Sequence, residues 1–161
     1  MRILGIDTTT KFLCLGIYDN ARVYEYNLEL GRKLSALLHP TIERTLGAAG
    51  LSIRMVDYFT CGLGPGSFTG ARLGLATILG LSWSLKKPVI GISTLDILAK
   101  GVKQNANQLV PVIDARRNLI YCSCFKNVNE SLRRTRPYML LSEDELYGSM
   151  EPGAVVFGDA V

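Results

Sequence analysis

The sequence lacks any long apolar run, and this absence excludes one class of protein. Its longest apolar segment, residues 71–85, is interrupted by polar side chains such as Arg72 and Thr77. It is shorter than the roughly 20 residues that a membrane-spanning helix needs. The N-terminus also lacks the succession of basic residues, apolar stretch and cleavage site that marks a secretory signal. We therefore expect a cytoplasmic protein without a membrane anchor.

Concentrated charge is also missing. The 18 basic and 14 acidic residues give a net charge of +4, and these charges are dispersed along the chain. A protein that binds nucleic acid by itself usually carries a dense basic stripe instead. Any contact with RNA is therefore expected to be indirect or shared with a partner.

Several catalytic and metal-binding signatures are absent. The chain has one histidine, His39, so it has no His-Glu-x-x-His site, and it has no Gly-x-Ser-x-Gly motif. None of its four cysteines forms a Cys-x-x-Cys pair. We expect reduced thiols in the core, with a redox role for Cys122 and Cys124 as the alternative. A protease is the least favoured class, because the sequence shows no recognisable nucleophile and base.

The pattern of apolar residues predicts an α/β protein. Half of the residues are apolar and a fifth are charged, which suits one large or two small domains. The expected strands are residues 2–6, 12–18, 23–28, 56–61, 89–92, 110–114, 119–125, 138–141 and 155–157. The expected helices are residues 34–49, 70–87, a segment begun by Ser93 and Thr94, and residues 142–147.

Two halves of the chain follow a similar plan. Each opens with a strand that ends in an aspartate, Asp7 or Asp114, and continues into a hairpin. A polar stretch, residues 100–108, lies between them and is typical of a hinge or linker. We expect an N-terminal lobe over residues 1–104 and a second lobe beginning in residues 105–161.

The most informative segment is the glycine-rich stretch at residues 62–74, where a strand enters a turn that opens into a helix. Free N–H groups at a helix start can bind an anion or a partner's backbone. The Walker motif is absent because Ala71 and Arg72 follow Gly70. The alternative is a tight turn in which Ser67 or Thr69 caps the helix.

The helix that follows this turn is apolar on nearly every side. Gly70 and Gly74 permit close backbone approach, and only Arg72 and Thr77 suggest an exposed side. Such a helix must be covered all round, either by a second layer of the same chain or by another protein. We favour another protein.

Taken together, these motifs resemble a known family. The duplicated plan is similar to the actin-like ATPase fold of sugar kinases and Hsp70-type chaperones. Four segments resemble the bacterial TsaB (YeaZ) family: MRILGIDTTT at residues 1–10, GLGPGSFTGAR at 62–72, GISTL at 91–95 and IDARR at 113–117. The resemblance implies a two-lobed actin-like ATPase (ribonuclease H-like) fold.

Two departures accompany the resemblance. The family usually continues beyond a segment like Gly158-Asp159-Ala160, so one expectation is an incomplete second lobe. Leu34 stands where the family often has histidine before the serine of the first helix.

The resemblance also implies a function in making N6-threonylcarbamoyladenosine in tRNA. In that family the TsaD paralogue transfers the threonylcarbamoyl group, and a TsaE-like ATPase takes part. The TsaD metal site uses two histidines, and His39 alone cannot build it. The implied role is therefore a scaffold without catalytic activity, pairing with a TsaD-like paralogue, or with a second copy when alone.

We expect the partner to contact helices of the first lobe. The expected interface residues are Leu34, Leu38, Gly70, Arg72, Leu73, Gly74, Thr77 and Leu81.

The rival hypothesis is a nucleotide-binding ATPase or kinase. Its candidate residues are Asp7, Thr8, Thr9 and Asp114, at the places where actin-like ATPases handle Mg²⁺ and phosphate. Against it, Ala115 follows Asp114 where such enzymes keep glycine. No cofactor is expected to be required, although ATP or ADP with Mg²⁺ fits the partner complex.

Two groups of arginines have open interpretations. Arg116 and Arg117 lie at the expected hairpin tip, where they contact either solvent or a phosphate or carboxylate. Arg133, Arg134 and Arg136 form a second basic cluster near a loop, which either faces solvent or approaches tRNA.

Overall fold

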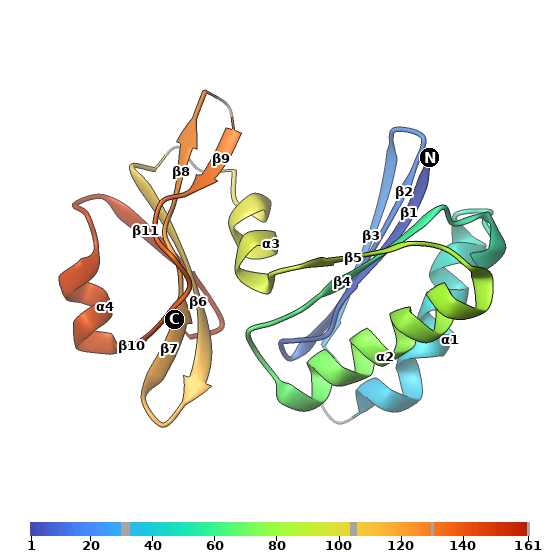
Figure 1. Ribbon diagram of the computed structural model, residues 1–161, viewed down its shortest axis with the longest axis horizontal. Helices are drawn as coiled ribbons and strands as arrows, with labels where there is room; N and C mark the ends of the chain where they lie inside the picture. Colours follow the sequence, from blue (N-terminus) through green and yellow to red (C-terminus); the bar gives the residue numbers. More distant parts are fainter. Residues whose placement is uncertain (30–32, 104–105, 130, 161) are drawn as a thin grey trace. The chain divides into compact units, whose positions relative to one another are not determined.

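The computed structural model describes residues 1–29, 33–103, 106–129 and 131–160 and divides into two compact units (Figure 1). Unit 1 is Met1–Ile92 and unit 2 is Ser93–Val161. Residues 104 and 105, between which the sequence placed the boundary, lie outside the described residues. The division precedes helix α3 (Thr94–Gly101) because α3 packs against strand β6 (Gln108–Arg116).

Unit 1 is built on a five-stranded sheet with the order β3-β2-β1-β4-β5. The antiparallel meander expected from the sequence is confirmed as β1 (Arg2–Asp7), β2 (Phe12–Asp19) and β3 (Arg22–Glu29). Strands β4 (Tyr58–Gly62) and β5 (Val89–Ile92) continue the sheet in parallel with β1. The carboxyl ends of β1 and β4 therefore meet at one edge of the sheet.

Two helices, α1 (Leu34–Ala48) and α2 (Phe68–Leu85), cover one face of this sheet (Figure 1). Alternate residues of the strands point to them, because side chains of a strand alternate between its two faces. Leu4 and Phe59 of the sheet share a core with Leu38 of α1 and Ile78 of α2, all with no exposed surface. Among the described residues, no helix is both long enough and apolar enough to cross a membrane.

The link between α1 and β4 contains one more helical turn, η2 (Ile53–Met55). The connection from β4 to α2 is the glycine-rich stretch, and Lys86, the C-cap residue that follows α2, has the left-handed conformation. A strand, a glycine turn and a helix thus follow in the order that the sequence predicts.

Unit 2 has a sheet with the order β10-β7-β6-β8-β9, and β11 pairs with β6. Its strands after β6 are β7 (Leu119–Cys122), β8 (Phe125–Val128), β9 (Ser131–Arg134), β10 (Met139–Ser142) and β11 (Ala154–Gly158). Helix α4 (Glu143–Ser149) begins with a capping box between Ser142 and Glu145. One core gathers around Val112, Cys122 and Leu146, and a second gathers around Leu109 and Phe125.

The strand expected over residues 119–125 is divided into β7 and β8. The break falls at Ser123 and Cys124, whose hydrogen bonds go to the segment after β9. The Ser123 hydroxyl donates to the carbonyl oxygen of Arg136 at 2.8 Å, and the Cys124 carbonyl accepts from the Thr135 amide at 2.7 Å. The sequence did not predict β9, since arginines 133 and 134 give it little strand character.

Both units share one local plan. In unit 1, β1 pairs antiparallel with β2 and parallel with β4. In unit 2, β6 pairs antiparallel with β7 and parallel with β11. The expected repeat of a strand and an antiparallel hairpin partner is confirmed, although β1 ends at Asp7 whereas β6 continues beyond Asp114 to Arg116. The chain has the α/β actin-like, ribonuclease H-like fold.

Candidate functional site

Four glycines of the glycine-rich stretch stand at every fourth position and contact the same short segment. We call Gly62, Gly66, Gly70 and Gly74 the glycine cradle. A Cβ atom on any of them would overlap residues 7–9. At Gly62 it would meet the Asp7 carboxylate, and at Gly66 the Thr9 carbonyl. At Gly70 it would meet the Thr8 carbonyl, and at Gly74 the Thr8 hydroxyl. The close backbone approach that the glycines permit is therefore to the protein's own turn after β1.

Hydrogen bonds fix that turn to the start of α2. The hydroxyl Oγ1 of Thr8 donates to the carbonyl oxygen of Gly70 at 2.7 Å. The backbone N–H of Ser67 donates to the carbonyl oxygen of Thr9 at 2.5 Å. Ser67 is the helix N-cap, since its hydroxyl accepts from the Gly70 amide at 3.2 Å. Of the two interpretations of this stretch, the geometry favours the tight, capped turn.

Asp7 holds the same turn in shape. Its Oδ1 accepts hydrogen bonds from the Thr9 amide at 2.8 Å and from the Thr9 hydroxyl at 2.6 Å. Asp7 is 8% exposed, and Thr8 and Thr9 are each 1% exposed. Burial, with the Asp7 carboxylate adding to it, raises the pKa of the neighbouring Cys61 thiol to about 11. The hydroxyls expected to handle phosphate thus bond within unit 1.

Asp114, the fourth candidate for nucleotide binding, belongs to unit 2. Its Oδ1 accepts from the Arg116 amide at 2.7 Å, and its Oδ2 lies 3.1 Å from Nη1 of Arg116. Its own amide donates to Oδ1 of Asp159 at 3.0 Å. Arg116, Arg117 and Asn118 all have positive φ, so Asp114 stabilises a tight hairpin. Within the described residues, no three His, Cys, Asp or Glu side chains gather into a group able to hold a metal ion.

The outer face of α2 is exposed and apolar. Its residues at helical spacing are Phe68, Arg72, Ala76, Leu79, Gly80 and Trp83, which we call the α2 stripe. Phe68 is 69% exposed and Trp83 is 87% exposed. The Arg72 guanidinium lies 3.7 Å from the centre of the Phe68 ring. Large exposed apolar side chains in a row are typical of a protein-binding surface.

The interface residues expected from the sequence occupy different positions. Leu38, Gly70, Gly74 and Thr77 are buried in unit 1, Leu34, Leu73 and Leu81 are half-buried, and Arg72 is exposed. Thr77 does not mark the exposed side, because the small residues of α2 pack against the sheet and the turn after β1. The sequence analysis missed Phe68, Leu79 and Trp83, although their spacing from Arg72 places them on one helical face.

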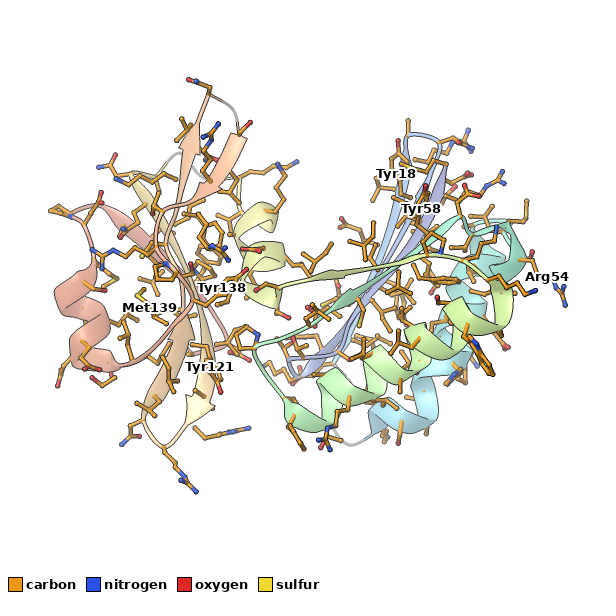
Figure 2. The ribbon with its side chains drawn as sticks, in the orientation of Figure 1. Tyr18, Arg54, Tyr58, Tyr121, Tyr138 and Met139 are labelled. Atoms are coloured by element: carbon orange, nitrogen blue, oxygen red, sulfur yellow. The ribbon has the colours of Figure 1, made fainter. Side chains whose placement is uncertain are left out.

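One member of the second arginine cluster, Arg134, has an aromatic contact within unit 2. The Arg134 guanidinium lies 4.1 Å from the centre of the Tyr138 ring, and the Tyr138 hydroxyl donates to Oδ2 of Asp96 at 2.6 Å. Figure 2 labels Tyr138 beside β10 and near α3, which carries Asp96. Burial and the Asp96 carboxylate raise the pKa of Tyr138. Arg133 and Arg134 lie at the end of strand β9, and Arg136 lies in the irregular segment that follows it, so the cluster is next to a loop as expected.

Known proteins match this chain over most of its length. The model of the TsaD family, described as tRNA N6-adenosine threonylcarbamoyltransferase, matches residues 29–156. The tRNA threonylcarbamoyladenosine biosynthesis protein TsaB of Escherichia coli K12 is 33% identical over 123 residues, which are 75% of this chain and 53% of that protein. The Bacillus subtilis protein of the same description is 28% identical over 138 residues, or 85% of this chain and 60% of that protein.

Two solved structures share the fold. One is a Pseudomonas aeruginosa protein with similarity to peptidase YeaZ; its TM-score is 0.88 at 28% identity, and the match covers 98% of this chain and 74% of that one. The other, YeaZ from P. aeruginosa, has a TM-score of 0.82 at 28% identity over 89% of this chain and 68% of that one. This chain spans a little over half the length of the curated relatives that it matches. On the family model, the relatives and the fold, the chain belongs to the TsaB (YeaZ) family.

Proposed function

We propose that this chain is a non-catalytic scaffold in the cytoplasmic synthesis of N6-threonylcarbamoyladenosine in tRNA. Its partner is a TsaD-type transferase, which carries out the chemistry, and a TsaE-type ATPase completes the complex. The proposal draws on the descriptions of the relatives, which name this pathway. Contact with tRNA is indirect or shared, in keeping with the dispersed net charge of +4.

The single observation that carries the proposal is the α2 stripe. Aromatic residues and arginine are enriched at the energetic centres of protein interfaces. The stripe has Phe68 and Arg72 at one end and Trp83 at the other, with large exposed fractions. Side chains of this size stay exposed in a monomer only at a cost in solubility, so a partner surface is the simplest account.

Small residues lie at the centre of the stripe. Ala76 and Gly80 are exposed, and a Cβ atom on Gly80 would meet nothing within 4 Å. A partner helix can therefore approach the α2 backbone closely between the large residues. When the transferase is absent, a second copy fits the same surface. Two α2 helices crossing antiparallel at Ala76 and Gly80 would bring Arg72 of one copy near Trp83 of the other.

A scaffold role also agrees with the bonding of the candidate nucleotide residues. The Thr8 and Thr9 hydroxyls donate to Gly70 and Asp7, and Asp114 bonds to its own hairpin. These groups hold the fold of their units. No cofactor of its own is part of the proposal, and ATP or ADP with Mg²⁺ is assigned to the partner complex.

The test is co-expression with the TsaD-type transferase of the same genome, followed by mass measurement of the purified complex. We expect a complex with the wild-type chain and none with Ala76→Arg, which places a long charged side chain at the centre of the stripe. Val128→Arg is the matched control, because it makes a similar change at a 41% exposed residue of unit 2. The proposal is contradicted if the wild-type chain does not co-purify with the transferase. It is also contradicted if the Ala76→Arg variant binds the transferase as the wild-type chain does.

A further inference from the structure

We propose that Thr8 is a positioning residue for the partner-binding face of α2. The inference rests on the proposed function, because it concerns the same surface. Thr8 itself is 1% exposed, so it acts on that face through α2 rather than by direct contact with a partner. Its side chain lies on the inner side of α2, and the α2 stripe lies on the outer side.

Thr8 contacts α2 at two successive turns. Its Oγ1 donates to the carbonyl oxygen of Gly70 in the first turn at 2.7 Å. The same oxygen lies too close for a real contact to the position that a Cβ atom of residue 74, one turn later, would take. One hydroxyl therefore sets both the bond to α2 and the distance of closest approach, so α2 can neither move inward nor drift outward at low cost.

The segment that carries Thr8 is itself held by hydrogen bonds. Its neighbours on both sides are bonded: Asp7 Oδ1 accepts from the Thr9 amide at 2.8 Å, and the Thr9 carbonyl accepts from the Ser67 amide at 2.5 Å. Asp7 ends β1, the central strand of the unit 1 sheet. These bonds therefore fix the position of α2 relative to the central strand of the sheet and not relative to a loop.

The turns of α2 that Thr8 contacts also carry one end of the α2 stripe. Phe68 and Arg72 belong to the same two helical turns as Ser67, Gly70 and Gly74. A shift of those turns moves Phe68 and Arg72 by a similar amount, and packed interfaces tolerate little displacement. Two motifs that are far apart in the sequence, residues 7–9 and residues 62–74, therefore together set the position of the α2 stripe.

The test measures binding of the TsaD-type transferase by calorimetry. Thr8→Val keeps the branched shape and removes the hydrogen-bond donor, and it should weaken binding about tenfold. Thr8→Ser restores the donor and should bind within about twofold of wild type. Circular dichroism and the urea midpoint of each variant report whether it folds. If folded Thr8→Val binds like wild type, or if Thr8→Ser fails to rescue binding, the inference is overturned.

A second pair of variants decides the matter if Thr8→Val does not fold. Gly74→Ala drives a Cβ atom into the Thr8 hydroxyl, whereas in Thr8→Ala/Gly74→Ala the nearest atom is the Cβ of residue 8 at 3.5 Å. We expect Gly74→Ala to weaken binding and the added Thr8→Ala change to recover part of the loss. Thr8→Ala is also measured alone, and effects of the two single changes that simply add in the double variant would overturn the inference. Binding by Ala76→Arg is measured in the same experiment and tests the proposed function separately. Loss of binding in that variant supports the proposed function, and normal binding contradicts the proposed function.

Discussion

The hydroxyl of Thr8 and the carbonyl of Gly70 form a hydrogen bond of 2.7 Å that joins the turn after β1 to the first turn of α2. The two residues are 62 positions apart in the chain, and each belongs to a motif that sequence inspection singles out. Their contact shows that the glycine-rich stretch packs on the protein itself. The exposed side of α2 is consequently the opposite one, which carries Phe68 and Trp83.

Alanine in the glycine cradle should destabilise unit 1, whereas alanine elsewhere in α2 should not. A Cβ atom at residue 70 would overlap the Thr8 carbonyl, but at residue 80 it would meet nothing within 4 Å. We expect Gly70→Ala to lower the free energy of unfolding by roughly 1–3 kcal/mol. The matched variant Gly80→Ala should raise it by roughly 0.5–1 kcal/mol, since alanine favours a helix over glycine. Urea unfolding measures both, and equal effects would contradict the cradle.

Asp7 should behave as a structural residue rather than a nucleotide ligand. Asp7→Ala removes the acceptor for both Thr9 hydrogen bonds and should cost roughly 1–3 kcal/mol in the free energy of unfolding. Calorimetry of the wild-type chain with millimolar ATP and Mg²⁺ should give no heat of binding. Tight binding that disappears in Asp7→Ala, in a variant that remains folded, would favour the ATPase or kinase hypothesis instead.

Alkaline pH should weaken the fold through its buried thiols. The pKa of Cys61 and that of Cys122 are each raised from 9.0 to about 11, chiefly because burial disfavours the thiolate. The unfolded chain therefore releases these protons at lower pH than the folded chain does. Stability is fully present below about pH 9 and declines as the pH rises towards 11.

The urea midpoint measured across that pH range checks this prediction. Lysine and tyrosine also titrate there, so Cys61→Ala is compared with wild type at each pH. The variant should lose less of its midpoint on going from pH 9 to pH 11. An identical decline in the two proteins would show that Cys61 contributes nothing to the pH dependence.

The fluorescence of Trp83 should report the occupancy of the stripe. It is the one tryptophan of the chain and is 87% exposed, so the free protein should emit at the long wavelengths of a hydrated indole and be quenched readily by iodide. Binding of the transferase should move the emission to shorter wavelength and reduce quenching. Unchanged emission in a complex whose mass has been verified would place the interface elsewhere.

Much of the fold could be predicted from local patterns. The strand at residues 89–92 was predicted with the bounds that it has, and the first helix differs by one residue at its end. Alternation and helical spacing are local properties, so they are visible in the sequence. Strand β9 was missed because its pairing with β8, rather than its arginines, makes it a strand. The expected strand 119–125 was divided because Ser123 and Cys124 bond to a segment further along the chain.

The sequence predicted which helix carries the candidate site but not which of its faces is exposed, because that depends on tertiary contacts. The glycines showed that something approaches α2 closely, but not whether it is a partner or the protein's own turn, since that depends on tertiary contacts. The sequence therefore placed Gly74 and Thr77 at an interface, and the structure buries them. Knowing which side of α2 faces the sheet identifies Phe68, Leu79 and Trp83 as the exposed residues.

Titration of the TsaD-type transferase with Leu79→Glu tests the central claim most directly. Leu79 is 49% exposed within the stripe, and a carboxylate there would have to be desolvated against an apolar partner surface. Calorimetry should show saturable binding by the wild-type chain. Leu79→Glu should bind at least a hundredfold more weakly, which is a loss of about 2.7 kcal/mol or more in the free energy of binding. Its urea midpoint should equal that of the wild-type chain. Equal affinity of the two proteins would contradict the claim that the outer face of α2 is what this chain offers its partner.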